Sequence, residues 1–215
     1  MQKGGVKMGV GLGIVKHALA GLMIVGGVGY ASKDYVKDYL VESNTKELVQ
    51  ETSDADIKKN KEKEAEYNFE DVKPVSVTNI VKAESSDSAV VGRIQIKSVN
   101  LDLPIIKGVS DDGMYKGAGT MKAGQELGKG NYALASHHMK DPNLLFSPLD
   151  RVNKGDDVVV SDDTGTYTYK IVEKREISAK DVYVIDDVEG HALITMITCR
   201  SEGDGRLLVQ GELVK

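Results

Sequence analysis

One part of the chain has the residue types needed for acyl-transfer chemistry. The apolar run 193–198 ends at Cys199, the only cysteine of the sequence, and Arg206 opens the next apolar run after a short polar turn. A thiol becomes a good nucleophile when a nearby cation lowers its pKa or a base takes its proton. The pair His137 and His138, together with Arg206, could supply both functions. Sulfur would attack a carbonyl, imidazole would protonate the leaving amine, and guanidinium would stabilise the oxyanion.

The residues alone leave plainer alternatives open. A lone cysteine at a strand end is often inert core, a histidine pair in a loop is often solvated, and an arginine that opens a strand is often a surface residue. A papain-like peptidase is a further alternative, but its cysteine precedes its histidine and starts a helix. No metal and no other cofactor is predicted, because one cysteine with these histidines lacks zinc-ligand spacing.

Short strands must position these groups. The stretches that combine β-branched or alternating apolar residues with flanking turn residues are 75–81, 90–96, 101–107, 132–136, 156–161, 166–172, 193–199 and 206–214. Helical turns are expected within 108–119 and 141–151, and a long connection over 177–190. Many short strands with few helices favour a closed or nearly closed β-barrel. We therefore expect a mostly β catalytic domain over residues 84–215.

The first 83 residues differ in character from the rest. Residues 1–16 carry three lysines and no acid, and residues 18–31 carry no charge. This pattern predicts a cytoplasmic basic segment and an uncleaved membrane helix over 1–31, with a cleaved or amphipathic leader as the alternative. Residues 32–83 are dense in charge and poor in apolar positions, which predicts a solvated extracellular spacer, helical near 35–49.

Composition limits the function classes. The 215 residues are 40% hydrophobic and 28% charged, with a formal net charge of -5. This mild acidity argues against a nucleic-acid partner, which would require a basic stripe. A single cysteine excludes an intrachain disulfide, so the fold depends on packing alone.

Several separated motifs resemble those of the sortases, the membrane-anchored cysteine transpeptidases of Gram-positive bacteria. The run 195–199 (TMITC) resembles their Thr-Leu-x-Thr-Cys motif, with methionine in place of leucine. The other matching segments are the class A histidine segment in 135–139 (ASHHM) and 145–149 (LFSPL), the substrate-groove segment in 117–121 (GAGTM), and the arginine strand in 206–209 (RLLV). The resemblance covers about residues 90–215 and keeps the family's order of histidine, cysteine and arginine.

The resemblance implies a closed eight-stranded barrel with short helices, and His137, Cys199 and Arg206 as catalytic residues. It implies cleavage of a C-terminal Leu-Pro-x-Thr-Gly (LPXTG) sorting signal between Thr and Gly through a thioacyl-enzyme. An amine of a peptidoglycan precursor of the lipid II type would then accept the protein. The partners would be LPXTG-bearing surface proteins and this precursor, and a homodimer is also kept open. The predicted substrate-binding residues are Ala118, Thr120, Ala135, His138, Val182, Val184 and Ile185.

Three finer expectations complete this interpretation. Arg200 should face away from the thiol, because adjacent strand residues point to opposite faces. No calcium requirement is expected, since the loop before the histidine offers only Glu126 and calcium takes six or more oxygens. A pilus-type or other-class sortase would add a lid before the core and a second C-terminal span, and neither is evident, so a class A role is favoured. A membrane-anchored, non-enzymatic β-domain with an inert thiol stays an alternative.

Overall fold

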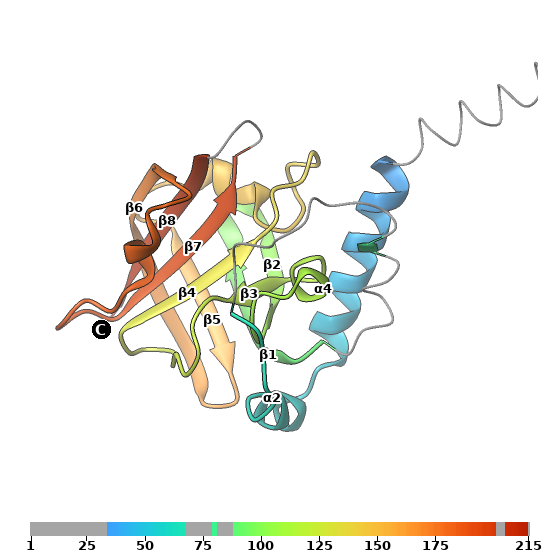
Figure 1. The fold of residues 1–215 in the computed structure, drawn as a ribbon, viewed down its shortest axis with the longest axis horizontal. Helices are drawn as coiled ribbons and strands as arrows, with labels where there is room; N and C mark the ends of the chain where they lie inside the picture. The colour runs from blue at the N-terminus through green and yellow to red at the C-terminus, as the bar shows by residue number, and fades with distance from the viewer. Residues whose placement is uncertain (1–33, 68–78, 81–87, 201–204, 215) are drawn as a thin grey trace, which may run out of the picture.

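A closed barrel forms the body of the computed structural model, which describes residues 34–67, 79–80, 88–200 and 205–214 (Figure 1). The eight strands of this described part follow the order β1-β2-β3-β4-β7-β8-β6-β5, and β5 closes the barrel onto β1. The strands are β1 (Val90–Ile96), β2 (Leu101–Ile106), β3 (Ala118–Thr120), β4 (Asn131–Ser136), β5 (Asp157–Asp162), β6 (Gly165–Ser178), β7 (Leu193–Cys199) and β8 (Gly205–Leu213). The predicted mostly β, eight-stranded barrel is confirmed.

Two parallel pairings determine which strand ends meet. β2 pairs with β3 and β4 pairs with β7 in parallel, whereas the remaining pairings are antiparallel. Parallel neighbours require a long crossover connection, and here residues 137–192 supply it between β4 and β7. The carboxyl ends of β4 and β7 therefore lie side by side, next to the beginning of β8.

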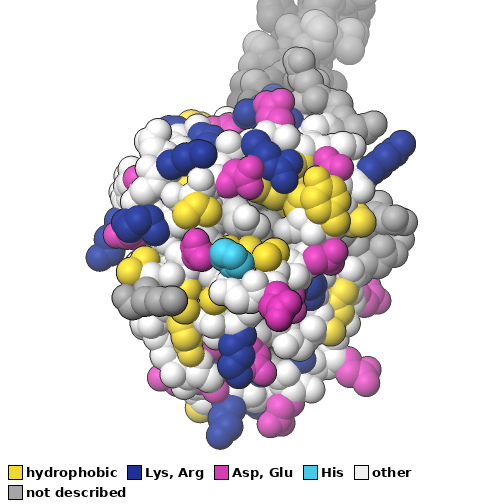
Figure 2. Space-filling view, turned by 90° about the vertical axis from the view of Figure 1, so that its left-hand side faces the viewer, with side chains coloured by type: hydrophobic (Ala, Val, Ile, Leu, Met, Phe, Trp, Pro, Cys, Tyr) yellow, Lys and Arg dark blue, Asp and Glu magenta, His cyan; other side chains and the backbone are white. Residues whose placement is uncertain are grey.

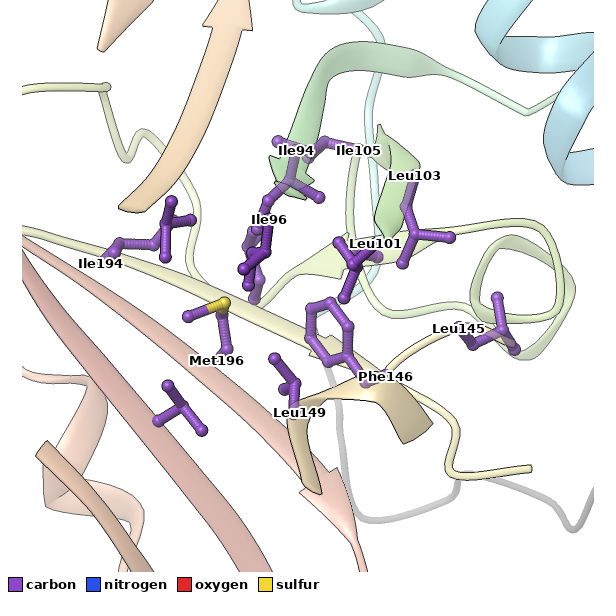
Figure 3. Close-up of a cluster of buried hydrophobic side chains, with 14 of the residues drawn as sticks. Ile94, Ile96, Leu101, Leu103, Ile105, Leu145, Phe146, Leu149, Ile194 and Met196 are labelled. Atoms are coloured by element: carbon purple, nitrogen blue, oxygen red, sulfur yellow. The ribbon is translucent and has the colours of Figure 1, made fainter. Parts of the chain in front are cut away.

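The barrel interior is filled by β-branched and aliphatic side chains (Figure 3). Ile94 and Ile96 of β1 point inward with Leu103 of β2 and Met196 of β7, and Phe146 packs among them with no exposed surface. Full burial of a side chain of this size contributes roughly 1.5–3 kcal/mol. Because no disulfide is available to a chain with one cysteine, this packing holds the strands in register.

Short helices occupy several connections. They are η1 (Lys97–Val99), α4 (Asp111–Met114), η2 (Ser147–Arg151) and η3 (Val182–Ile185). α4 and η2 are the helical turns expected within 108–119 and 141–151, and η3 lies in the expected long connection. The local sequence accounts for α4, since the Ser110 hydroxyl accepts a hydrogen bond from Gly113 N at its N-terminus.

Three expectations about strands differ from the structure. The strand expected at 75–81 lies mostly outside the described residues, and its two described members, Asn79 and Ile80, are helical. β3 was not predicted, because three small residues carry no strand pattern of their own. β6 runs to Ser178 instead of ending near 172, since it pairs with β5 as far as Lys170 and with β8 from Tyr169 to Ser178, across a bulge between Ile171 and Glu173.

The segment before the barrel packs against it, which corrects the expectation of a solvated spacer. Residues 34–51 are helical, as predicted near 35–49, but Val41 on this helix is fully buried in the main core cluster. The Thr45 hydroxyl donates to Lys116 O at 3.1 Å, and Asp34 pairs with Lys140 at 2.9 Å. A few apolar and small polar residues on one face are thus enough to pack this helix against the barrel, although the rest of its surface is charged.

A second helix, α2 (Asp54–Asn60), attaches the same segment to another side of the barrel. Ser53 and Asp56 form a capping box at its start. At its end, Asn60 Nδ2 donates to Val90 O of β1 at 3.0 Å, and Lys61 pairs with Asp162 at 2.6 Å. The N-terminal segment is therefore anchored to the barrel at both of its helices.

The described surface shows no sign of a basic stripe on the side of β6 and β8. Acidic and basic side chains are interspersed over that face (Figure 2). The expected membrane helix over 1–31 lies outside the described residues. Within the ranges that the structure describes, no helix is both long and apolar enough to cross a membrane.

Candidate active site

The two threonines of the cysteine strand attach β7 to β4. Near the start of β7, the Thr195 hydroxyl donates to Asn131 Oδ1 at 2.7 Å, and near its end the Thr198 hydroxyl donates to Ser136 O at 2.8 Å. The register of the parallel pair runs from Asn131 opposite Leu193 to Ser136 opposite Thr198. The next residues along the two chains are His137, just past the end of β4, and Cys199, the last residue of β7, which therefore lie side by side.

Arg206 lies directly across from Cys199 on the neighbouring strand. Arg200 N donates to Gly205 O at 3.0 Å, so residues 200 and 205 are a hydrogen-bonded pair of the β7–β8 hairpin. Because such pairs alternate along an antiparallel ladder, Cys199 and Arg206 form the closer, non-hydrogen-bonded kind. Residues in such pairs share a face and have Cβ atoms about 4.5–5.5 Å apart. Arg206 is therefore the basic residue that shares a face with Cys199.

Cys199 is partly exposed. Ile197, two residues before Cys199, belongs to a small apolar cluster outside the barrel interior together with Ile177, Val184 and Leu208. Residues two apart on a strand share a face, so the thiol lies on this outer face of the sheet. A partly exposed thiol on an outer face can be reached by a substrate, in contrast to the inert core thiol considered above.

His137 is held in an apolar setting at the end of β4. Its side chain is buried, and its ring stacks on that of Tyr115 with centroids 4.9 Å apart and planes inclined by 11°. Burial lowers the pKa of the His137 imidazole from its ordinary value of 6.5 to about 4, against a smaller opposing effect of Asp111. The resting imidazole is therefore neutral at pH 7.

Two polar atoms of the site stand out because they are buried without a hydrogen bond. They are Nε2 of His137 and Nε of Arg206. Buried polar atoms are nearly always paired, and an unpaired one costs roughly 1–3 kcal/mol. One atom comes from the end of β4 and the other from β8, the two strands that flank the Cys199 strand β7, and this placement favours a site whose polar groups are arranged for a substrate.

Arg200 faces away from the thiol, as expected. Its guanidinium donates to Glu176 Oε1 at 2.9 and 3.1 Å and to Asp150 Oδ1 at 2.8 Å. His138 contacts the same aspartate as Arg200, with its Nε2 atom 2.8 Å from Asp150 Oδ2. The prediction that His138 binds substrate is therefore not supported by its placement, because the residue after His137 points to the opposite face and is paired there.

The structure brings together only some of the predicted substrate-binding residues. Val184 and Ile185 pack into the outer apolar cluster that leads to Cys199, while Val182, at the start of η3, is 72% exposed and is not part of this cluster. Ala118 lies in the barrel interior, and Thr120 is directly opposite the interior residue Leu134. Both side chains therefore lie on the inner face of β3, opposite the outer face that carries Cys199, and the Thr120 hydroxyl accepts a hydrogen bond from Gly108 N at 2.7 Å; their role in substrate binding stays a prediction.

Ala135 does lie on the outer face, two residues before His137. There it is fully buried under Val109 and Met114, and Met121 packs against both this cluster and the one around Ile197. Ala135 therefore forms part of the floor beneath the site, without exposed surface of its own.

Asn131 and Asp187 fix the connection that carries η3. Asn131 Nδ2 donates to Val184 O at 3.0 Å and to Asp186 O at 3.1 Å. Asp187 accepts hydrogen bonds from Asn131 N at 2.8 Å and from Lys122 Nζ at 2.6 Å, and these donors lower its pKa. The same asparagine that binds Thr195 thus holds the apolar residues of η3 over the outer face.

Sequence reasoning missed Asn131, Asp187 and Tyr115 as parts of this site. Asn131 directly precedes the predicted strand 132–136 and falls in the stretch expected to be a loop, although in the structure it opens β4. Tyr115 lies 22 residues before His137 in a stretch of turn residues. Nothing in the local pattern indicates that its ring covers an imidazole, since only the closure of the barrel brings the two together.

Comparison with known proteins agrees with this geometry. A family model described as "Sortase domain" matches residues 94–214, more than half of the chain. Sortase A of Listeria monocytogenes is 36% identical over 207 residues, covering 94% of this chain and 93% of that protein. Sortase A of Streptococcus agalactiae is 35% identical over 210 residues, covering 94% of this chain and 85% of that protein.

Solved structures give the same result. The crystal structure of Listeria monocytogenes sortase A superposes with a TM-score of 0.57 at 41% identity, covering 60% of this chain and 89% of that one. Sortase C2 of Group B Streptococcus Pilus Island 1 superposes with a TM-score of 0.55 at 27% identity, covering 61% of this chain and 78% of that one.

Proposed function

The chain belongs to the sortase family of cysteine transpeptidases, and from this premise we propose that it is a class A enzyme that sorts proteins to the cell wall. Its substrate would be a protein with a C-terminal LPXTG signal, cleaved between Thr and Gly. The acceptor would be an amine of a lipid II-type peptidoglycan precursor. One observation carries the proposal: Cys199 lies opposite Arg206 and one register step beyond the Ser136–Thr198 pair that leads to His137.

The first step forms the thioacyl-enzyme. The thiol proton of Cys199 passes to the imidazole of His137, and the sulfur attacks the carbonyl carbon of the scissile Thr–Gly bond. The guanidinium of Arg206 donates to the negative carbonyl oxygen of the tetrahedral intermediate. The imidazolium of His137 then protonates the amine of glycine, which leaves as the C–N bond breaks and a thioester remains.

The second step transfers the acyl group to the acceptor. The amine attacks the thioester carbonyl, His137 takes its proton, and the sulfur leaves as the C–S bond breaks. A neutral imidazole at rest suits this proton acceptance. It also means that only a small fraction of resting enzyme has both the thiolate and the imidazolium, because burial of His137 disfavours its charged form.

Apolar residues next to the site support selectivity for Leu and Pro of the signal. Val184 and Ile185 pack with Ile197, two residues before the thiol, and Val182 of the same short helix is exposed. The connection that carries η3 is held by the side chain of Asn131, the first residue of β4. A pocket for Leu and Pro therefore has a fixed wall. The Thr–Gly bond itself needs little side-chain recognition at glycine.

The relatives favour class A over a pilus-type role. Sortase A proteins are 35–36% identical over nearly the whole chain, and among solved structures that cover about the same share of the chain, sortase A is 41% identical and the pilus sortase C2 is 27% identical. A binding domain with an inert thiol is disfavoured by the partial exposure of Cys199 and by the unpaired donors of His137 and Arg206 beside it.

We place the catalytic domain outside the cell, on a single membrane helix within residues 1–31 with a cytoplasmic N-terminus. The uncharged run 18–31 supports this location. So do Tyr35, Val36 and Tyr39, which are 75%, 42% and 60% exposed at the start of the described helix, since tyrosines are enriched at membrane surfaces. Protease digestion of intact cells should remove the domain if this topology is correct. Protection of the domain would contradict it.

A direct assay tests the activity. A soluble chain beginning at Ser32, which keeps every described segment, is incubated with a Leu-Pro-x-Thr-Gly peptide and a glycine-based amine, and the products are identified by mass spectrometry. The expected product joins Thr to the added amine. The Cys199→Ala and His137→Ala variants should form none, whereas His138→Ala should retain turnover. A wild-type chain that never cleaves the Thr–Gly bond would refute the proposal.

A further inference from the structure

Tyr115 covers the imidazole of His137. This tyrosine follows α4, is 1% exposed, and stacks on the imidazole with ring centroids 4.9 Å apart. We propose that Tyr115 is a positioning residue that fixes the plane of the catalytic imidazole, and that the N-terminal segment holds Tyr115 in place through Asn79. This inference rests on the proposed function, because it assigns His137 its catalytic role.

The stack is the contact that orients the ring. His137 lies one residue beyond the last paired residue of β4, where the sheet register no longer constrains the side chain. Its Nε2 is buried without a hydrogen bond, so this atom does not lock the ring. A nearly parallel aromatic neighbour restricts rotation of the imidazole and excludes water from one of its faces.

The short segment that carries Tyr115 is held from three directions. Asn79 Nδ2 donates to the hydroxyl of Tyr115 at 3.3 Å. The Thr45 hydroxyl donates to Lys116 O at 3.1 Å, and the Ser136 hydroxyl donates to Gly117 O at 2.7 Å. Asn79 and Thr45 belong to the N-terminal segment, and Ser136 is the last residue of β4, directly before His137.

Packing reinforces these hydrogen bonds. Ile80, next to Asn79, is fully buried and belongs to the same apolar cluster as Tyr115 and Val41. Gly117 lies so close to β2 that a Cβ atom there would come within 2.3 Å of Pro104 O. The backbone at 115–117 is thus confined between the barrel and the N-terminal segment, and a small shift of that segment would be transmitted to the ring over His137.

A proton-transfer group tolerates little misplacement. A displacement of about 1 Å can reduce a rate by about a hundredfold, so loss of the stack should lower kcat. The KM for the sorting peptide should change little, because Tyr115 is buried behind the imidazole and does not face the outer apolar cluster near Cys199. A tyrosine that only supports the fold would change stability without this selective loss of kcat.

The test compares variants of the full chain in detergent micelles. Tyr115→Leu removes the ring, Tyr115→Phe keeps the ring but removes the hydroxyl, and Asn79→Ala removes the partner of the hydroxyl. The matched control is Tyr169→Leu, since Tyr169 is also fully buried but lies in the barrel interior with its hydroxyl accepting from Gly128 N. Steady-state kcat and KM are measured with the peptide and amine substrates, at a temperature below the unfolding transition of every variant.

Tyr115→Leu should lose about tenfold or more in kcat with KM nearly unchanged. Tyr115→Phe and Asn79→Ala each remove the hydrogen bond between Asn79 and the Tyr115 hydroxyl, so each should lose about two- to fivefold in kcat, as expected for one hydrogen bond. Tyr169→Leu should lower the melting temperature without a selective loss of kcat.

Three results would overturn the inference. The first is a wild-type kcat in Tyr115→Leu, and the second is a Tyr169→Leu variant that loses kcat as much as Tyr115→Leu does. If Tyr115→Leu does not fold, the comparison moves to Asn79→Ala and Tyr115→Phe, and wild-type kcat in Asn79→Ala is the third. A wild-type chain without turnover refutes the proposed function itself, whereas active wild type with insensitive variants refutes only the inference about Tyr115.

Discussion

The buried imidazole of His137 should make the stability of the protein depend on pH in a way that one substitution removes. In the unfolded chain this histidine has an ordinary pKa near 6.5, and in the folded protein burial lowers the pKa to about 4. Between these values the unfolded state binds a proton that the folded state does not. The free energy of unfolding therefore falls as the pH decreases from about 6.5 to about 4. Above pH 6.5 the histidine is neutral in both states and this loss of stability is absent.

The magnitude follows from the separation of the two pKa values. A difference of about 2.5 pH units corresponds to about 3.5 kcal/mol in full, since each unit is worth about 1.4 kcal/mol, and about 3 kcal/mol of this is lost by pH 4, where the folded state is half protonated. That is a large fraction of the 5–15 kcal/mol typical of a folded domain. His137→Gln carries no titrating group and should lack this loss, whatever constant change in stability it brings.

The assay is denaturant unfolding of the chain beginning at Ser32, at several pH values between 4 and 8. Carboxylates such as Asp162 and Asp187, whose pKa values ion pairs and hydrogen bonds lower, will also destabilise both proteins in acid. The relevant quantity is therefore the difference between wild type and His137→Gln, in which these effects cancel. This difference should change by about 3 kcal/mol from pH 7 to pH 4.

The control substitution is His191→Gln. The side chain of His191 is 49% exposed, so folding does not remove its imidazole from water as it does for His137. Parallel stability curves for wild type and His137→Gln over the whole range would refute the reasoning. A change of the same size for His191→Gln would also refute it, because burial could then not be its cause.

Three further predictions concern the arginines, the metal and the core. Arg206→Ala should reduce kcat by about 10²–10³-fold, as expected for a lost oxyanion donor. Arg200→Ala should keep kcat within about threefold of wild type, because the ion pairs of Arg200 are at the surface. A larger loss of kcat in Arg200→Ala than in Arg206→Ala would contradict the assignment of Arg206 as the oxyanion donor. Millimolar calcium or a chelator should leave turnover unchanged, and a severalfold rise with calcium would show that a site had been overlooked. Phe146→Ala should lower the free energy of unfolding by about 3–5 kcal/mol, whereas Val172→Ala, at a half-exposed position, should lower it by less than about 0.5 kcal/mol. Both variants are measured by thermal and denaturant unfolding, and an equal loss of stability in the two would contradict the assigned core.

The calcium prediction has a basis in the ion pairs of the site region. Glu126 pairs with Lys129 at 2.6 Å, and Asp187 pairs with Lys122 at 2.6 Å. Calcium binding would require these carboxylates to exchange a lysine partner for the metal and would still leave most of the six or more oxygens to be found.

The sequence determined much of this protein by itself. Alternation and β-branched runs placed seven of the strands, because a half-buried pleated surface leaves a periodic trace in the chain. The cysteine motif, the histidine pair and the arginine strand identified the chemistry, since a thiol, an imidazole and a guanidinium are few in this chain and appear in a recognisable order. The opposite directions of Arg200 and Cys199 followed from the two-residue period of a strand alone.

Only the tertiary structure decided what depends on closure of the barrel. It turned Ala118 and Thr120 inward and paired His138 with Asp150, because a strand's faces acquire an inside and an outside only when its neighbours are fixed. It seated the charged N-terminal helix on the barrel through Val41, a contact between residues too far apart for any local pattern to indicate. It also brought Tyr115 onto His137, so that the setting of this imidazole depends on side chains from segments that share no motif.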